Sequence, residues 1–283
     1  MKLKINDASR REHSVIRLGH DGNPLLVVDN FLENPHEVRE FGLDLQFRAP
    51  KTRYPGYRAE CSMRGVPNVS QWVGEHVWTE VYDHPPDHPL IADFDGSTVQ
   101  SDTSFNCFCP RLDANIQSIH IDSHSWLAIL IYLKEDMEDQ TGTAFWRHTP
   151  TGLESMFYSS NLLAMQTLEN LFEIDILEKL RATYADTPRL QFETVVREMM
   201  KEGPPPPPDQ SHGDWELLDS VQAKFNRLVA YPTWQWHSAV YPHYTPPETL
   251  DDARLTLNTF VEYPLERLQS DHVGIDLDTP NVG

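Results

Sequence analysis

Three side chains able to ligate a metal ion form the most informative pattern in this chain of 283 residues: His120, Asp122 and His237. Residues at positions i and i+2 of a strand point to the same face, so His120 and Asp122 can reach one ion from one strand end. His237, far along the chain, completes a triangle of ligands. Two imidazoles and one carboxylate on one face of an octahedron leave three adjacent positions open, as in non-haem Fe(II) oxygenases. The pattern therefore predicts an iron site that accepts a chelating 2-oxo acid and O2.

The residues around the His-x-Asp pair strengthen its interpretation as a metal site. This support is needed because the chain holds 13 histidines, so such a pair can arise by chance. The pair follows an apolar run at 116–119 that predicts a strand, and it precedes a turn, where a ligand at a strand end belongs. His243 competes with His237 for the third position, but His237 follows a predicted strand directly and has the better spacing to Arg254. A further histidine, His124, shares the parity of the aspartate, and we expect the turn to carry it away from the ion.

Arg254 opens the most strand-like run of the chain, 254–263, and supplies the charge that a co-substrate needs. 2-Oxoglutarate that chelates iron through C1 and its keto oxygen leaves its C5 carboxylate buried. A guanidinium matches that carboxylate with two parallel hydrogen bonds. We therefore expect Arg254 to anchor 2-oxoglutarate, with Thr256 on the same strand face adding a hydroxyl. Tyr132 is a further candidate for a hydrogen bond to the co-substrate.

Aromatic and basic residues near the predicted metal ligands are candidates for the substrate pocket. Trp146 and Arg147 follow a Gly-Thr turn, and Trp236 directly precedes His237, so all three are expected at the mouth of the site. Core packing of the two tryptophans and an exposed turn position for Arg147 are the alternatives. Arg147 and Arg227 are also rivals for the anchoring role, unless they pair with acidic neighbours.

The composition is that of an ordinary globular protein with a strongly acidic surface. The chain is 39% hydrophobic and 23% charged, which argues against wholesale disorder, and its net charge is −20. Such a surface repels phosphate, so nucleic acid and anionic membranes are not expected partners. The N-terminal sequence lacks the features of a signal peptide, and no apolar run is long enough to cross a bilayer. We interpret Cys61, Cys107 and Cys109 as reduced thiols. We expect a cytoplasmic protein, with its oligomeric state open and a homodimer among the options.

The elements that must position these side chains are mainly short strands. We predict strands at 24–32, 104–109, 116–120, 126–133, 144–147, 223–231, 235–241 and 254–263. One short helix is predicted from Pro35, with Asn34 as its N-cap, and a second at 69–82. Apolar residues at spacings of three and four predict further helices within about 158–202.

Strands, a helical insertion and then more strands predict a single domain over 1–283, mainly β with added helices. Its core strands are expected at about 104–147 and 223–263, the insertion at about 158–202, and a poorly ordered tail at 267–283. A domain boundary at the proline run Pro204–Pro208 is the alternative.

The four residues of the site resemble the motif of the iron(II)/2-oxoglutarate-dependent dioxygenases. That motif is His-x-Asp, a distal His and an Arg soon after it, and it matches His120, Asp122, His237 and Arg254. Four flanking pieces are similar to a bacterial branch without a known substrate that is related to prolyl hydroxylases: Val27–Leu32, Tyr54–Gly56, Thr141–His148 and Asn226–Tyr231. The resemblance implies a double-stranded β-helix core, of the jelly-roll or cupin-like kind, with Fe(II) as cofactor. It also implies 2-oxoglutarate and O2 as co-substrates, with release of succinate and CO2.

The main hypothesis is therefore an oxygenase acting on a small molecule, an amino acid or a residue in a peptide. Halogenating members of the superfamily carry a small residue where this chain has Asp122, so the resemblance implies hydroxylation or desaturation. The net charge argues against a nucleic-acid dealkylase. A metal-binding jelly roll without turnover, acting as a sensor or partner protein, is the second hypothesis. Arg254 argues against it, because a binding module has no use for a carboxylate anchor.

Overall fold

The structure is a computed structural model, which describes residues 1–50, 56–77, 100–108, 119–122, 125, 127–135, 142–149, 154–155, 211, 213–240, 249 and 252–262. The chain divides into two compact units, one formed by Met1–Ser155 with Pro204–Glu262 and the other by Met156–Gly203 with Tyr263–Gly283. All the described helices and strands belong to the first unit. The predicted insertion at 158–202 and the predicted tail at 267–283 lie outside the described residues.

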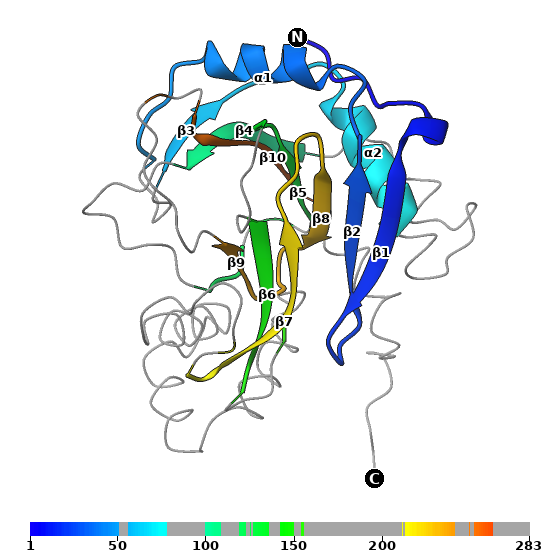
Figure 1. Cartoon of the computed structure of the whole chain (residues 1–283), viewed down its shortest axis with the longest axis vertical. Coiled ribbons are helices and arrows are strands. Elements are labelled where there is room, and N and C mark those ends of the chain that lie inside the picture. The colour runs from blue at the N-terminus through cyan, green and yellow to red at the C-terminus, as the bar shows by residue number, and fades with distance from the viewer. Residues whose placement is uncertain are drawn as a thin grey trace, which may run out of the picture. The chain divides into compact units, whose positions relative to one another are not determined.

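The first unit is mainly β and contains two antiparallel sheets (Figure 1). The larger sheet has the order β1-β2-β8-β5-β10-β4-β3, with the strands Glu12–Leu18, Asn23–Asp29, Leu228–Pro232, Leu127–Tyr132, Arg254–Glu262, Gln100–Phe108 and Tyr57–Glu60. The smaller sheet has the order β7-β6-β9, with the strands Trp215–Gln222, Gly142–His148 and His237–Val240. These strands confirm the predicted mainly β class, and antiparallel strands in two sheets are typical of a β-sandwich.

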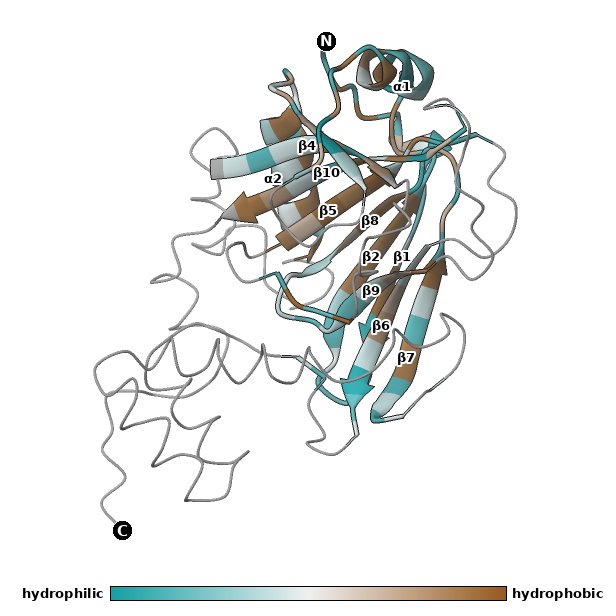
Figure 2. Cartoon of the chain, turned by 90° about the vertical axis from the view of Figure 1, so that its left-hand side faces the viewer, coloured by the Kyte–Doolittle hydropathy of each residue, from teal (hydrophilic) through white to brown (hydrophobic). Residues whose placement is uncertain are grey.

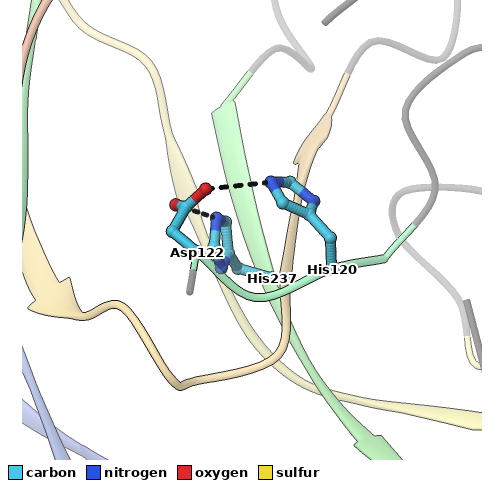
Figure 3. A group of neighbouring side chains, drawn as sticks. All are labelled: His120, Asp122 and His237. Carbon is cyan, nitrogen blue, oxygen red and sulfur yellow. Dashed lines mark ion pairs between the residues drawn. The ribbon is translucent and has the colours of Figure 1, made fainter. Parts of the chain in front are cut away.

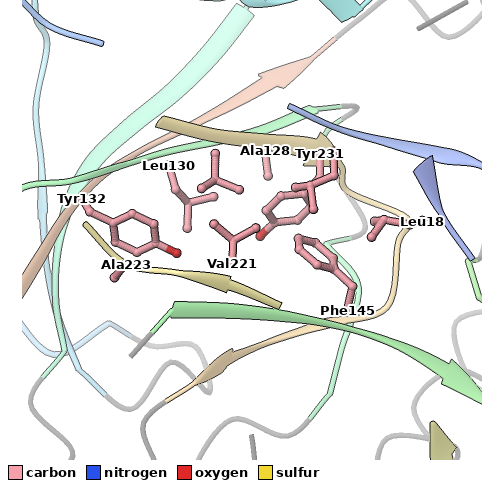
Figure 4. Packing of buried hydrophobic residues seen from close by; sticks show 10 residues of the cluster. Leu18, Ala128, Leu130, Tyr132, Phe145, Val221, Ala223 and Tyr231 are labelled. Atoms are coloured by element: carbon pink, nitrogen blue, oxygen red, sulfur yellow. The ribbon is translucent and has the colours of Figure 1, made fainter. Parts of the chain in front are cut away.

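The core lies between the two sheets, where apolar side chains from both pack together (Figure 4). Its buried members are Leu18, Leu25, Ala128, Leu130, Tyr132, Phe145, Val221, Ala223, Val229 and Tyr231. Every residue of β5 is buried, because the strand is central in its sheet, between β8 and β10. Figure 2 shows β5 as almost wholly hydrophobic, whereas β4 carries several hydrophilic residues.

Two helices accompany the larger sheet. Helix α1, Pro35–Leu43, packs against β4, and a Cβ added at Gly42 would lie 2.5 Å from the Phe105 ring. Helix α2, Val66–His76, contacts the segment after β2 through Trp72, whose ring centroid is 5.3 Å from that of Phe31. No helix within the described residues has the length and hydropathy needed to span a membrane.

The two helices predicted within the described residues are present, with two corrections. Asn34 does occupy the N-cap position of α1, but its side chain makes no capping hydrogen bond. Its amide instead accepts from the Lys4 backbone N–H at 3.2 Å and donates to the Lys2 carbonyl at 3.1 Å, which ties the N-terminal segment to the helix. Helix α2 begins at Val66, before the predicted start at 69, because Gly65 with φ 91° and the following Pro67 favour a helix start there.

The predicted strand at 223–231 is wrong in its first half. The chain forms β7 up to Gln222, turns, and enters β8 at Leu228. Asn226 in the turn has φ 61° and is buried, and its side-chain oxygen accepts from the Leu32 N–H at 2.8 Å while its amide donates to the Leu32 carbonyl at 2.9 Å. These bonds hold the turn against the segment that follows β2, an interaction between distant residues that a local apolar pattern does not reveal.

The Asn226 turn makes a first testable prediction. Asn226→Ala removes two buried hydrogen bonds and places a Cβ-bearing residue without local hydrogen bonding in the left-handed region, so the free energy of unfolding should fall by about 2–4 kcal/mol. Asn226→Gly relieves the backbone strain and should lose about 1 kcal/mol less. Denaturant unfolding measures both. Asn30→Gly, at an exposed position with φ 54°, is the control and should change stability by less than about 0.5 kcal/mol. Equal losses in Asn226→Ala and Asn30→Gly would contradict this account.

Candidate metal centre

A short antiparallel bridge places His120, the first predicted ligand, opposite His237, the last. His120 and His237 exchange two backbone hydrogen bonds, N–H to carbonyl in both directions, each 2.9 Å long. The Asp122 N–H donates to the carbonyl of Thr233, four residues before His237, at 2.9 Å, which adds a further contact between the two segments. Alternation along the strand buries Ile119 and Ile121 and turns His120 and Asp122 to the other face.

The three side chains point toward one another (Figure 3). One donor atom from each of His120, Asp122 and His237 lies within 4.8 Å of the others. His237 Nε2 is 3.3 Å from Asp122 Oδ2, and His120 Nε2 is 3.9 Å from Asp122 Oδ1. Both histidines are buried, whereas 29% of the Asp122 side chain is exposed. Solvent therefore reaches the three residues at the Asp122 side chain.

The charges around Asp122 favour its ionised form. Burial raises the pKa of the carboxyl, but the hydrogen bond from His237 and the charges of His237, His120 and Arg58 outweigh burial, and the pKa lies below its ordinary value. A carboxylate rather than a carboxylic acid is the form that binds a cation.

The ring orientation of His237 suits a metal ligand. Its Nδ1 lies 2.8 Å from the Gln235 carbonyl, which can only accept, so Nδ1 carries a proton, and Nε2, which faces Asp122, is the nitrogen that would bind a metal in place of its hydrogen bond to the carboxylate. Such a backbone acceptor orients the ring of a ligating histidine. The donor set of two imidazole nitrogens and a carboxylate oxygen fits a divalent first-row metal. Among the described residues, no fourth His, Cys, Asp or Glu belongs to the group.

Arg254 is buried in the interior with part of its hydrogen-bonding capacity unused. Its Nη2 donates to the Gly142 carbonyl at 3.0 Å, and its Cζ lies 5.3 Å from the centroid of the Tyr132 ring. Its Nε is buried without a hydrogen-bond partner. A buried guanidinium in this state is unusual, because buried charged groups are normally paired. The group is therefore suited to an anion from outside the chain.

The two other predicted co-substrate residues lie next to Arg254 but already make contacts. The Tyr132 hydroxyl is 2.8 Å from Thr143 Oγ1, and the Thr256 hydroxyl donates to the Asn106 carbonyl at 3.5 Å. Thr256 is the cross-strand partner of Tyr132, so the two side chains share the inner face of the larger sheet with Arg254.

Tyr231 is a further residue of this interior, and the sequence reasoning missed it. Its ring centroid is 4.8 Å from that of His237, and Figure 4 shows its hydroxyl pointing into the core. Burial and the charges of Asp122 and Tyr132 raise the pKa of the phenol well above its ordinary value, against a smaller opposing effect of Arg254. A neutral hydroxyl therefore belongs to the interior beside His237. Tyr231 could have been found from the sequence, because alternation along the strand that precedes His237 turns its side chain toward the interior.

The three predicted substrate residues occupy packed or ion-paired positions. Trp146 and Trp236 are completely buried, and Trp146 Nε1 donates to Ser238 Oγ at 2.9 Å. Trp236 packs against Trp215 with ring centroids 5.1 Å apart. Both indoles are thus part of the core, which was the alternative interpretation.

Both rival anchors are engaged by carboxylates. Arg147 pairs with Glu154 and with Glu216, and Arg227 donates to both oxygens of Asp29, at 2.6 and 2.9 Å. This leaves Arg254 as the buried anchor candidate among the three. His124, His243 and Cys109 lie outside the described residues.

Glu154 holds the segment that precedes His237 in place, and no sequence pattern pointed to this residue. Its carboxylate is 1% exposed and accepts from Arg147 and from the backbone N–H groups of His20 and Asp21. Its backbone carbonyl accepts from the Trp236 N–H at 3.2 Å and from Gln235 Nε2 at 2.8 Å. The residue therefore connects the β1–β2 turn and β6 to the two residues before His237.

Comparisons with known proteins give a family and distant structural likenesses. The model of a family described as "Family of unknown function (DUF6445)" matches residues 9–197 and 178–261. No curated protein matches the chain. One solved structure, described as a novel N-substituted L-amino acid dioxygenase from Burkholderia ambifaria AMMD, is similar at 9% identity and a TM-score of 0.36, covering 93% of this chain and 99% of that chain. A TM-score this low carries no argument about function.

Glu154 makes the second prediction. Glu154→Gln removes the buried charge that holds Arg147 and the β1–β2 turn, so unfolding should become easier by about 1–3 kcal/mol. The carboxylate also positions the backbone carbonyl of residue 154, which holds Gln235 and Trp236. Co(II) affinity, followed by the visible cobalt spectrum, should therefore fall about tenfold. Glu216→Gln is the matched control: it removes the exposed carboxylate partner of the same arginine and should change stability by less than about 1 kcal/mol. An unchanged Co(II) affinity in Glu154→Gln would refute the supporting role.

The pH dependence of stability tests the same group. Burial raises the pKa of Glu154, but the hydrogen bonds from His20, Asp21 and Arg147 lower it more, so the folded pKa lies below the ordinary 4.5. The unfolded state then binds the proton more readily, and this stabilisation is present above the ordinary pKa and lost as pH falls through the folded pKa. Unfolding free energy should therefore drop between about pH 5 and 3, and more steeply in the wild type than in Glu154→Gln.

Proposed function

This chain belongs to the DUF6445 family, and we propose that it is an iron(II)- and 2-oxoglutarate-dependent oxygenase. The observation that carries the proposal is the triangle of His120, Asp122 and His237, whose donor atoms lie within 4.8 Å of one another. Two imidazoles and a carboxylate on one side of an ion leave the other side open to a chelating co-substrate and O2. A structural zinc site would instead be closed by four protein ligands.

The path of the chain supports a double-stranded β-helix around this triangle. β4 and β5 belong to the larger sheet, β6 and β7 to the smaller one, and β8, β9 and β10 alternate between larger, smaller and larger. Between β4 and β5, the segment of His120 bridges to β9 of the smaller sheet. Alternation of this kind winds the chain as a jelly roll does. A relation to prolyl hydroxylases within the superfamily is part of the same proposal.

Iron(II) held by the three side chains would supply the redox chemistry that couples oxidation of a substrate to conversion of 2-oxoglutarate and O2 into succinate and CO2. The chain's own residues bind and orient. Arg254 takes the C5 carboxylate, because its buried guanidinium has a donor without a partner. Tyr132 packs against the guanidinium, and Thr256 adds polarity on the same face. The reaction we propose is hydroxylation of a small molecule, an amino acid or a peptidyl residue.

Iron binding gives the third prediction. Anaerobic addition of Fe(II) and then 2-oxoglutarate to the purified chain should produce a weak visible charge-transfer band, and admission of air should produce succinate. His120→Ala and His237→Ala should each abolish the band while leaving the fold intact, because each removes one of three ligands. His36→Ala removes a surface histidine that is 70% exposed and should keep the band. No band in the wild type would sink the proposal, and a band without any succinate would favour a metal-binding protein without turnover.

The anchor gives the fourth prediction. Arg254→Ala leaves a carboxylate without its cation, so the KM for 2-oxoglutarate should rise about 30-fold or more, with Arg254→Lys in between. Initial rates of succinate formation measure it. Arg227→Ala removes the rival that pairs with Asp29 and should leave that KM unchanged. If instead Arg227→Ala raises the KM and Arg254→Ala does not, the anchor is assigned to the wrong arginine.

A further inference from the structure

The inner face of the larger sheet has an apolar half and a polar half. The apolar half belongs to β5 and β8 and forms the core of Figure 4. Toward the β3 edge, cross-strand pairs place Arg58 beside Asn106 and Asn106 beside Thr256, and the next row pairs Ser104 with Asn258. Directly paired residues point to the same face of a sheet, so these five side chains share one surface with Tyr132 and the core.

Asn258 presents a buried acceptor without a donor. Its side chain is nine-tenths buried, and its amide oxygen is buried without a hydrogen-bond partner. Buried polar atoms are nearly always hydrogen-bonded, and an unsatisfied one destabilises the fold by about 1–3 kcal/mol. The position therefore calls for a donor that the described chain does not supply.

Arg58 brings a positive charge to the same surface, held in place by a buried neighbour. Its Nε donates to Asn106 Oδ1 at 3.2 Å, and the same oxygen accepts from the Ser104 hydroxyl at 3.0 Å. The Arg58 side chain is only half-buried, so a ligand can reach it. The same inner face carries Tyr231, the cross-strand partner of Ala128, whose ring centroid is 4.8 Å from that of His237, so the surface belongs to the side of the sheet on which the candidate metal ligands lie.

This surface is distinct from the anchor at Arg254. Arg254 and Asn258 lie four residues apart on β10, which corresponds to about 13 Å at roughly 3.3 Å per residue. One carboxylate cannot engage both positions. The interior therefore offers two separate polar subsites, one on either side of Thr256.

We propose that the surface of Arg58, Ser104, Asn106 and Asn258 is the substrate site, and that the substrate is a small carboxylic acid bearing an N–H or O–H donor. The carboxylate binds the Arg58 guanidinium, and the donor binds the Asn258 oxygen. A local cation is required for such a substrate, because the chain as a whole carries a net charge of −20. This inference rests on the proposed oxygenase function, whose substrate it describes.

The fifth prediction concerns ligand binding by the complete chain loaded anaerobically with Fe(II) and 2-oxoglutarate. The probes are the L-amino acids and the corresponding 2-hydroxy acids, each compared with its methyl ester. At least one acid should raise the midpoint of thermal unfolding at a concentration where its ester does not, because a ligand that binds only the folded state stabilises it. In air, the same acid should accelerate succinate formation.

Variants then locate the site. For the acid that binds best, Arg58→Ala should weaken binding about 30-fold and Asn258→Leu about tenfold, while Arg58→Lys should recover part of the loss. Arg48→Ala removes an exposed arginine that pairs with Arg58 through two backbone hydrogen bonds, which the substitution keeps, and the variant should bind the acid as the wild type does. Equal binding of acids and esters, or unchanged binding in Arg58→Ala and Asn258→Leu, overturns the substrate site.

The two proposals fail in different ways. A charge-transfer band and slow succinate formation without any effect of the acids would overturn the substrate site and leave the oxygenase standing. Absence of the band and of succinate would overturn the oxygenase. The thermal-shift comparison of acid and ester would then still decide whether the surface binds carboxylic acids.

Discussion

The site depends on one backbone interaction, the pair of hydrogen bonds between His120 and His237. The bridge sets two residues opposite each other that are far apart in the chain, and their ring centroids come within 4.3 Å. Asp122 follows two residues later on the same face, with its own N–H held by the Thr233 carbonyl. Because side chains alternate along strands, a slip of one residue in this pairing would turn a ligand away from the group. The register of this pairing therefore controls the geometry of the candidate metal centre.

The register is supported from outside the bridge. The carbonyl and carboxylate of Glu154 hold Gln235 and Trp236 on one side, and Arg147 with the β1–β2 turn on the other. Gly19 allows that turn to approach, since a Cβ there would lie 2.1 Å from the Glu154 carboxylate. The carbonyl of Gln235 in turn orients the His237 ring. Interactions among residues 19–21, 147 and 154 thus help to orient the candidate metal ligand His237.

Local patterns in the sequence predicted the parts of the molecule that local physics determines. Alternation and β-branched runs located most of the strands, and the i, i+2 spacing at His120 and Asp122 placed both on one face. Long-range pairings escaped prediction. The turn at Asn226 depends on Leu32, and the burial of Trp146 and Trp236 depends on packing partners such as Trp215. Glu154 escaped because its environment consists of backbone groups contributed by other parts of the chain.

The electrostatics of the interior argue for turnover rather than storage of a metal. Burying a guanidinium without a carboxylate is unfavourable by several kcal/mol, and Arg254 keeps one donor unsatisfied. A protein that only held a metal would gain nothing from this feature, and it would gain affinity from a fourth ligand that the described group does not contain. In the proposed oxygenase, one molecule would occupy both the free side of the metal and the position beside the buried cation. A dicarboxylate that chelates the ion at one end and meets the arginine at the other has this form.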